Sequence, residues 1–338
     1  MKQILSVLII LSVFFNSCTT EFDVIDEWKD ITVIYCLLNQ NDTIHYAKIE
    51  KAFLGEADAY EMAKISDSLY YDNITVSLEE YDNDNLTNIF YLEKTTEIPK
   101  DTGIFADDNN VLYKTDASLI STRKYRLVVY NPDLDKTVYG ETKLINGIEV
   151  TSLPPKINIA NYEYPYSVEW KSSANARIYN VSVDFHYFEI NLTSGDTTFH
   201  TVKWNVGTKI SSNASSSSEN MYVELTPQSF LKTLASNITI KDDVIRVVHK
   251  DAIDIIFQVG GADLYTYMEV NGPSFSVIQE KPEFTNIVDG IGLMSSLYDK
   301  VFLSNEITDR SVDSVAHSIY TSKLSFEDHT SLYYQAQF

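Results

Sequence analysis

The sequence has 338 residues, of which 44% are hydrophobic and 12% aromatic, so the chain can build a substantial core. It holds 48 Asp and Glu residues against 26 Lys and Arg residues, which gives a formal net charge of −22. So acidic a chain excludes binding to nucleic acid or to an anionic membrane face, because both need a basic patch. The length exceeds one ordinary core and favours two domains.

The first 17 residues have the pattern of a lipoprotein signal peptide. Lys2 supplies a minimal positive charge, and Ile4 to Phe15 is almost unbroken apolar sequence. This run is too short for a permanent membrane span and suits a signal peptide. Phe15-Asn16-Ser17-Cys18 resembles a lipobox, with a small residue directly before the cysteine. We expect cleavage between Ser17 and Cys18, lipidation of Cys18 with diacylglycerol and a further acyl chain such as palmitate, and a tether over residues 18–29.

An ordinary signal peptide followed by a chance cysteine is the alternative. No A-x-A-like cleavage site lies near the end of the apolar run, which weakens that alternative. The acidic Glu21 and Asp23 resemble a thin version of a surface-export signal, and the choice between the periplasmic face and the cell surface stays open. With Cys18 lipidated, only Cys36 remains. Its apolar, strand-like surroundings favour a small buried hydrophobe over a nucleophile.

Residues 30–150 are predicted to form an N-terminal β-sandwich domain. Short alternating segments bounded by Asn, Asp and Gly recur about every ten residues, which is typical of an antiparallel sandwich or barrel. The residues from Ala52 to Ser66 depart from this pattern and predict at most a short helical excursion. The strand-like runs are Ile31 to Leu38, Thr43 to Ile49, Ile74 to Leu78, Ile89 to Leu92, Val111 to Lys114, Lys124 to Tyr130 and Lys136 to Leu144.

Residues 151–338 are predicted to form a second β domain with helical insertions. Pro154 and Pro155 mark the joint before it, because two prolines restrict the backbone. Tyr166 to Trp170 and the strand after Ala174 resemble two strands of a fibronectin type III-like module, in which Trp170 and Tyr179 would be core residues. The remaining elements are a proline-started helix at Thr226 to Ala235, strands at Val244 to Val248 and Asp254 to Val259, a short helix at Ala262 to Val270 and an extended end at Leu324 to Phe338.

Several short stretches together resemble a family of Bacteroidota outer-membrane lipoproteins of unknown function, which are often encoded beside TonB-dependent receptors. They are Ile31 to Asn39, Trp170 with its following strand, Asp263 to Met268, and Phe284 to Met294. The resemblance implies an outer-membrane location and an outer-membrane β-barrel as a partner. It supplies no catalytic residue.

The sequence contains few local motifs for catalysis or ligand binding. No two of the six histidines have metal-ligand spacing, and no G-x-S-x-G serine motif occurs. Gly290-Ile-Gly292 lacks the rest of a phosphate-binding loop and favours a bulge or a close approach of strands. The acidic runs Asp82 to Asn85 and Asp107 to Asn110 suit solvated turns better than calcium sites. Four Asp-Ser/Thr triplets resemble an O-glycosylation signal, and begin at Asp42, Asp67, Asp196 and Asp313.

These observations favour a membrane-anchored, non-enzymatic accessory or binding subunit at the outer membrane, with no cofactor, no metal and no catalytic residue. The alternative is a surface glycan-binding or adhesive protein, which would present some of the 23 tyrosines, 16 phenylalanines and 3 tryptophans as a contiguous exposed patch. A hydrolase ranks third, since it would need carboxylates that converge in a pocket.

Overall fold

The computed structural model describes residues 31–52, 69–100, 110–153, 156–213, 218–272 and 283–337. Of these residues, 53% lie in strands and 13% in helices. Most of the strands pair antiparallel, so the predicted mainly β, sandwich-like class is confirmed. The predicted signal peptide, the tether and the helical excursion after Ala52 lie outside the described residues.

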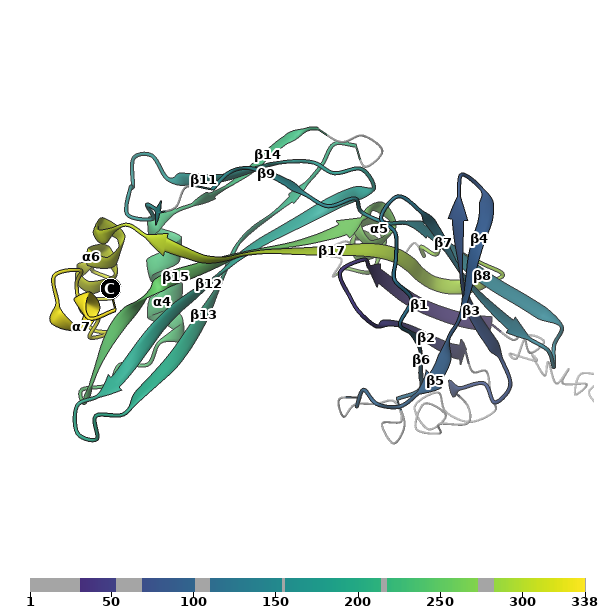
Figure 1. Cartoon of the computed structure of the whole chain (residues 1–338), viewed down its shortest axis with the longest axis horizontal. Helices are drawn as coiled ribbons and strands as arrows, with labels where there is room; N and C mark the ends of the chain where they lie inside the picture. Colours follow the sequence, from purple (N-terminus) through teal and green to yellow (C-terminus); the bar gives the residue numbers. More distant parts are fainter. Residues whose placement is uncertain are drawn as a thin grey trace, which may run out of the picture.

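The largest sheet has nine strands and runs along most of the molecule (Figure 1). Its order is β13-β12-β15-β17-β1-β2-β6-β5, and the two-residue β10 also pairs with β17. These strands are β1 (Ile31–Asn39), β2 (His45–Ala52), β5 (Glu93–Thr95), β6 (Leu112–Thr115), β10 (Lys156–Ile157), β12 (Ala176–Asn191), β13 (Thr197–Ile210), β15 (Val244–Gly261) and β17 (Gly290–Ile307).

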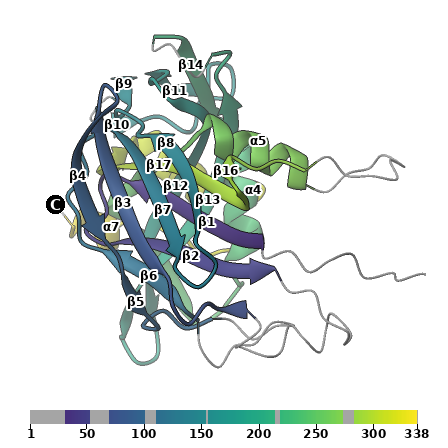
Figure 2. The ribbon, with the colours of Figure 1, turned by 90° about the vertical axis from the view of Figure 1, so that its right-hand side faces the viewer.

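Two smaller sheets cover different parts of the large one. The five-stranded sheet has the order β16-β8-β7-β3-β4, and the three-stranded sheet has the order β14-β11-β9. Figure 2 shows the five-stranded sheet beside β1 and β2. Their strands are β3 (Thr75–Asp82), β4 (Asn85–Tyr91), β7 (Lys124–Asn131), β8 (Lys136–Lys143), β9 (Glu149–Ser152), β11 (Tyr166–Lys171), β14 (Asn220–Leu225) and β16 (Ile287–Val288).

Each pair of layers encloses its own hydrophobic core. In the first sandwich, alternate residues of β1 such as Ile34 and Leu38 meet Leu78 and Leu127 of the five-stranded sheet. In the second sandwich, Phe185 and Phe257 of the large sheet belong to the same core as the inner side chains of the three-stranded sheet and of helix α4 (Pro227–Asn237). Period-two alternation along the strands therefore produces two cores that share one sheet.

Strand β17 joins the two sandwiches. Its first part, Gly290 to Leu297, pairs in parallel with β1, and its second part, from Leu297 onward, pairs antiparallel with β15 on the other edge. Ile287 and Met294 belong to the first core, although the rest of that core comes from residues 34–144. The described residues thus show a C-terminal segment completing the N-terminal sandwich.

Four helices lie in the described residues, namely α4 (Pro227–Asn237), α5 (Ala262–Asn271), α6 (Asp309–His317) and α7 (Leu332–Gln335). Helix α4 begins with proline in its first turn, as predicted, and buries Phe230, Leu231 and Leu234 against the second core. The predicted helix after Gly261 is confirmed as α5. None of these helices combines the length and apolar character needed to cross a bilayer.

The predicted core pair of the second domain is confirmed. Trp170 is 1% exposed and Tyr179 is fully buried, with ring centroids 5.8 Å apart. The Tyr179 hydroxyl accepts a hydrogen bond from the backbone N–H of Ser173 at 2.7 Å, which fixes the turn between β11 and β12. The polar tip of the tyrosine is therefore satisfied inside the core.

Two predictions for the C-terminal part were wrong. The segments Val244 to Val248 and Asp254 to Val259 are one continuous strand, β15, with an irregularity between them. The end of the chain is not an extended segment: it forms turns and α7, where the Ser331 side chain accepts a hydrogen bond from the backbone N–H of Tyr333. This end folds over the second core, because it buries the apolar side chains Leu324, Phe326 and Tyr334.

Candidate functional site

The residues predicted for lipidation and cleavage, Cys18 and Ser17, lie outside the described residues, and their roles stay predictions. Cys36 lies on β1 and is 2% exposed, as predicted. Burial raises the pKa of its thiol to about 12. Since the thiolate is the reactive form, Cys36 serves as a packed apolar side chain and not as a nucleophile.

The carboxylates of the acidic run at the β3–β4 turn form ion pairs with basic side chains of the protein. Asp82 forms an ion pair with Arg123, and Asp84 forms one with Lys124 at 2.9 Å. Asn83 and Asp84 have φ values of 46° and 69°, which is ordinary for the centre of a tight hairpin. Residues 107–109 of the second acidic run are not described. Among the described residues, no group of three or more His, Cys, Asp and Glu side chains could hold a metal ion.

A polar groove, here called the junction groove, lies where loops of the two sandwiches meet. It consists of two cavities of about 310 and 430 Å³ that share Asn146 and Ala174 in their walls. The first sandwich contributes the β3–β4 turn and the start of β7, and the second contributes the turn before β12. Concave sites at such junctions are common ligand sites, so the groove is our candidate functional site.

The loops of the junction groove are held in place by specific contacts. The Asn175 side chain donates a hydrogen bond to the Leu144 carbonyl at 2.8 Å, which ties the second sandwich to the end of β8. Asn175 itself has a φ of 67°, a conformation that asparagine tolerates better than most residues. Gly147 has a φ of 83° and lies against the ring of Tyr298. The walls of the groove therefore come from fixed turns.

Three cations line the smaller cavity of the groove. Arg123 and Lys124 are held by the carboxylates of the β3–β4 turn, and Lys143 is exposed at the end of β8. The hydrogen bond with Lys124 is the largest effect that lowers the pKa of the Asp84 carboxyl, which therefore remains charged at neutral pH. Asp84 is the only carboxylate among the described residues that line this cavity.

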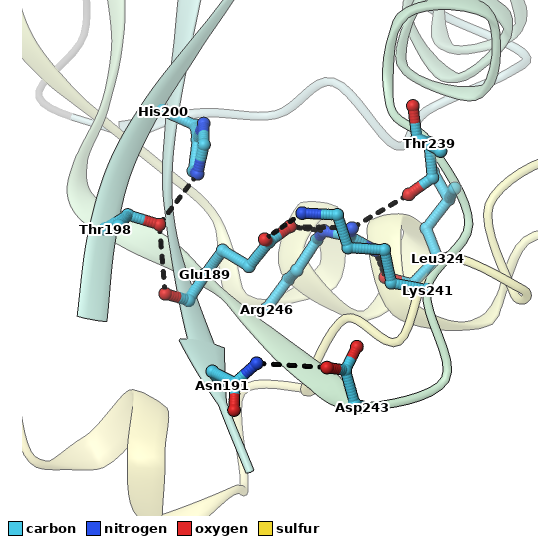
Figure 3. Close-up of polar contacts among 9 residues, drawn as sticks. All are labelled: Glu189, Asn191, Thr198, His200, Thr239, Lys241, Asp243, Arg246 and Leu324. Carbon is cyan, nitrogen blue, oxygen red and sulfur yellow. Dashed lines mark hydrogen bonds and ion pairs between the residues drawn. The ribbon is translucent and has the colours of Figure 1, made fainter. Parts of the chain in front are cut away.

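A buried ion-pair network links β12 and β15 in the second sandwich (Figure 3). Arg246 on β15 is 1% exposed and donates to Glu189 on β12 and to the carbonyls of Thr239 and Leu324. Lys241 donates to the other oxygen of Glu189 at 2.6 Å. Burial opposes ionisation of Glu189, but hydrogen bonds from Lys241 and Arg246 hold the pKa of its carboxyl below the ordinary value.

This network is better suited to structure than to catalysis. Both oxygens of Glu189 already accept hydrogen bonds from cations, so the carboxylate is a poor general base. The Arg246 bond to Leu324 also attaches the C-terminal segment to β15, next to the isolated bridge between Arg246 and Phe326. The network therefore serves as the anchor of the C-terminal segment.

An aromatic cluster lies on the solvent side of β12, β13 and β15, opposite this network. Phe199 is 55% exposed and lies 5.7 Å from Phe188, 5.4 Å from His186 and 5.6 Å from His249, measured between ring centroids. The His186 ring also makes hydrogen bonds with Asp254 and Thr201, each at 3.0 Å. No sequence motif identifies His186 as a site residue. The period-two alternation of His186 and Phe188 with buried residues of β12 is the pattern that could have predicted aromatic rings on this outer face.

The chain matches no protein-family model and no curated protein, so the groove and the cluster are interpreted from their geometry alone.

Proposed function

We propose that this protein is a membrane-anchored, non-enzymatic accessory or binding subunit at the outer membrane, associated with a TonB-dependent receptor or another β-barrel. The observation that carries the proposal is the lipobox-like Cys18 placed a few residues before a self-supporting pair of sandwiches. Nothing in those sandwiches requires a disulfide, because the one cysteine among the described residues is a buried thiol.

The position of β1 sets which part of the protein would lie near the membrane. Strand β1 begins at Ile31, and an extended chain reaches at most about 3.5 Å per residue. A lipid on Cys18 would therefore keep the first sandwich within about 45 Å of the bilayer. Figure 1 shows α6 and α7 at the opposite end of the molecule from the first sandwich. The first sandwich, to which β1 belongs, is then the part nearest a barrel in the same membrane.

Purification with the lipid intact tests this function. Membranes of the native organism are dissolved in mild detergent, and the tagged full chain is recovered together with its partners. We expect a β-barrel protein to co-purify, and we expect Cys18→Ser to abolish incorporation of labelled palmitate and to release the protein from the membrane. Recovery of the lipidated chain without a barrel would overturn the partner, and palmitate labelling of Cys18→Ser would overturn the anchor.

The exposed cluster around Phe199 favours a second candidate function, a surface glycan-binding or adhesive protein. Rings at the surface can stack on sugar faces, and the flanking Thr201 and Asp254 can accept hydrogen bonds from hydroxyls. Binding of whole cells or of the purified chain to insoluble polysaccharides tests this function. Phe199→Ala should reduce retention, whereas Tyr333→Ala, which removes a ring of similar exposure from α7, should not. Equal retention of both variants would remove the candidate.

A further inference from the structure

The smaller cavity of the junction groove has a net positive lining, opposite in sign to the chain as a whole. The chain carries a net charge of −22, yet the smaller cavity is lined by Arg123, Lys124 and Lys143 against the single carboxylate of Asp84. A concave site lined by one sign of charge concentrates ligands of the other sign. In so acidic a protein, this local excess of cations indicates an anionic ligand.

The three cations are placed differently, and the difference matters for binding. Lys124 is held between Asp84 at 2.9 Å and Glu141 at 3.7 Å, so its ammonium group is fixed but partly neutralised. Lys143 is exposed at the groove, and its charge lowers the pKa of the Asp84 carboxyl less than does Lys124, which holds that carboxyl by a hydrogen bond. It is therefore the cation most available to an incoming carboxylate.

Arg123 adds a second indication. Its guanidinium is paired with Asp82, but its Nε–H is buried and has no hydrogen-bond partner in the described structure. A buried donor without an acceptor costs free energy, and such donors are rare unless a ligand or water satisfies them. Because the Arg123 side chain is 25% exposed and lines the smaller cavity, an anion bound there would lie beside a guanidinium that still has a hydrogen bond to make.

The rest of the lining shows which class of anion fits. Apart from Ala174 and the ring of Tyr81, the smaller cavity presents amides, hydroxyls and charges, and it offers no apolar socket for a peptide side chain. The Tyr81 ring is itself covered by Lys124 and Arg126, each 5.1 Å from its centre. The polar neighbours, which suit a ligand rich in hydroxyl groups, are Asn83, Ser121, Thr122, Asn146 and Asn175.

We infer that the junction groove binds an acidic oligosaccharide, with a uronate carboxylate on Lys143 and Arg123 and sugar hydroxyls on the amide and hydroxyl side chains of the lining. The adjoining cavity of about 430 Å³ provides room for further sugar units beyond Asn146 and Ala174. This inference rests on the protein being a binding protein, but it does not depend on the barrel partner.

Calorimetric titration of the full-length lipidated protein in detergent tests the inference. The probes are trigalacturonate, the uncharged trisaccharide of galactose, and galactose 6-phosphate. We expect binding of trigalacturonate that weakens as salt rises, and much weaker binding of the uncharged trisaccharide. No binding of trigalacturonate, or equal binding of the uncharged trisaccharide, would overturn the inference. Binding of the sugar phosphate alone would overturn the assignment to a carboxylate.

Charge reversal at the groove provides the matched comparison. Lys143→Glu should weaken binding of trigalacturonate by about tenfold or more, because it places a carboxylate opposite the ligand's own. Lys203→Glu makes the same charge change on β13 at a lysine that lines neither cavity, and should leave the affinity unchanged. Equal affinities of the two variants would overturn the site. Recovery of a barrel partner is a separate measurement. A groove that does not bind trigalacturonate would therefore overturn the ligand without changing the result for the anchor or the partner.

Discussion

Arg246 donates two hydrogen bonds to one oxygen of Glu189, from Nη2 at 2.7 Å and from Nε at 3.0 Å, across the β12–β15 pair. The two residues are direct partners in the register of these strands. An unpaired polar atom costs free energy at this depth, so each nitrogen of the buried guanidinium needs a partner. Nε and Nη2 donate to Glu189, and Nη1 donates to the Leu324 carbonyl.

Replacing Arg246 with methionine should be strongly destabilising. Arg246→Met leaves one oxygen of the buried Glu189 without its cation and frees the carbonyl of Leu324, so we expect a loss of about 3–5 kcal/mol in the free energy of unfolding. Lys241 is the other partner of Glu189, and its own side chain is 46% exposed, so Lys241→Met should cost only about 0–1 kcal/mol. Denaturant titration followed by fluorescence measures both.

The double variant Arg246→Met with Glu189→Met separates the pair from its surroundings. Because it leaves no unpaired buried charge, and Lys241 is exposed, it should be markedly more stable than Arg246→Met alone. A double variant no more stable than the single one would show that the carbonyl contacts, and not the ion pair, carry the stabilisation.

A second buried carboxylate, Glu80 on β3, should make the first sandwich sensitive to acid. It is 2% exposed and accepts hydrogen bonds from Tyr125 at 2.7 Å and Thr87 at 2.8 Å. Burial raises the pKa of Glu80, but these hydrogen bonds outweigh it and the pKa lies below the ordinary value of 4.5. Its stabilisation is therefore fully present above pH 4.5 and is lost as pH falls through the folded pKa.

Replacing Glu80 with glutamine tests this dependence. One oxygen of Glu80 accepts from the Tyr125 hydroxyl and the other accepts from the Asn88 amide, so a glutamine in either orientation replaces one of these acceptors with an amide nitrogen that cannot accept. Glu80→Gln should cost about 1–3 kcal/mol at neutral pH and should flatten the loss of stability in acid. The matched control is Glu169→Gln, at an exposed glutamate of β11, which should change neither quantity.

The sequence predicted those parts of the fold that depend on local pattern. Alternation identified most of the strands, and the Thr-Pro start identified α4. The pairing of the shared strand β17 with β1 could not be predicted. It joins residues more than 250 positions apart in the chain, and the periodicity of a strand does not indicate which strand pairs with it.

The candidate site could not be predicted from the sequence for a related reason. Arg123 and Lys143 lie in separate segments of an acidic chain, and only the meeting of the β3–β4 turn, β7 and β8 brings them to one cavity. The acidic run at Asp82 suits a solvated turn better than a calcium site, but spacing alone could not show that Arg123 and Lys124 neutralise it. Long-range pairing of charges decided the chemistry of this turn.

The C-terminal segment should respond to pH in the opposite direction from Glu80. His329 Nδ1 lies 2.6 Å from the Asp313 carboxylate, and this hydrogen bond is the main cause that raises the pKa of His329, helped by Asp309 and Asp328. The added stability is therefore fully present below the ordinary histidine pKa of 6.5 and is lost as pH rises through the folded pKa.

The variant His329→Gln should show this as a change in Tm. We expect a lower Tm than that of the natural chain at about pH 5.5 and nearly the same Tm at about pH 8.5. His200→Gln provides a comparison at a half-buried histidine whose ring contacts the Thr198 hydroxyl and no carboxylate among the described residues. A pH-independent loss at His329 would assign its role to packing. Scanning calorimetry at both pH values is the measurement.

At Gly292, β17 lies too close to β1 to leave room for a side chain, in agreement with the predicted close approach of strands. A Cβ at this position would lie 2.0 Å from the carbonyl oxygen of Ile34, and the φ of +118° is one that other residues rarely adopt. Gly292→Ala must therefore push the two strands apart, and we expect a loss of at least about 3 kcal/mol together with faster amide exchange along β1. Gly195 has a φ of +77°, but a Cβ added there would meet no described atom within 4 Å, so Gly195→Ala isolates the backbone cost at about 1 kcal/mol. Equal losses at the two glycines would mean that backbone conformation, and not the contact with Ile34, fixes the strand shared by the two sandwiches.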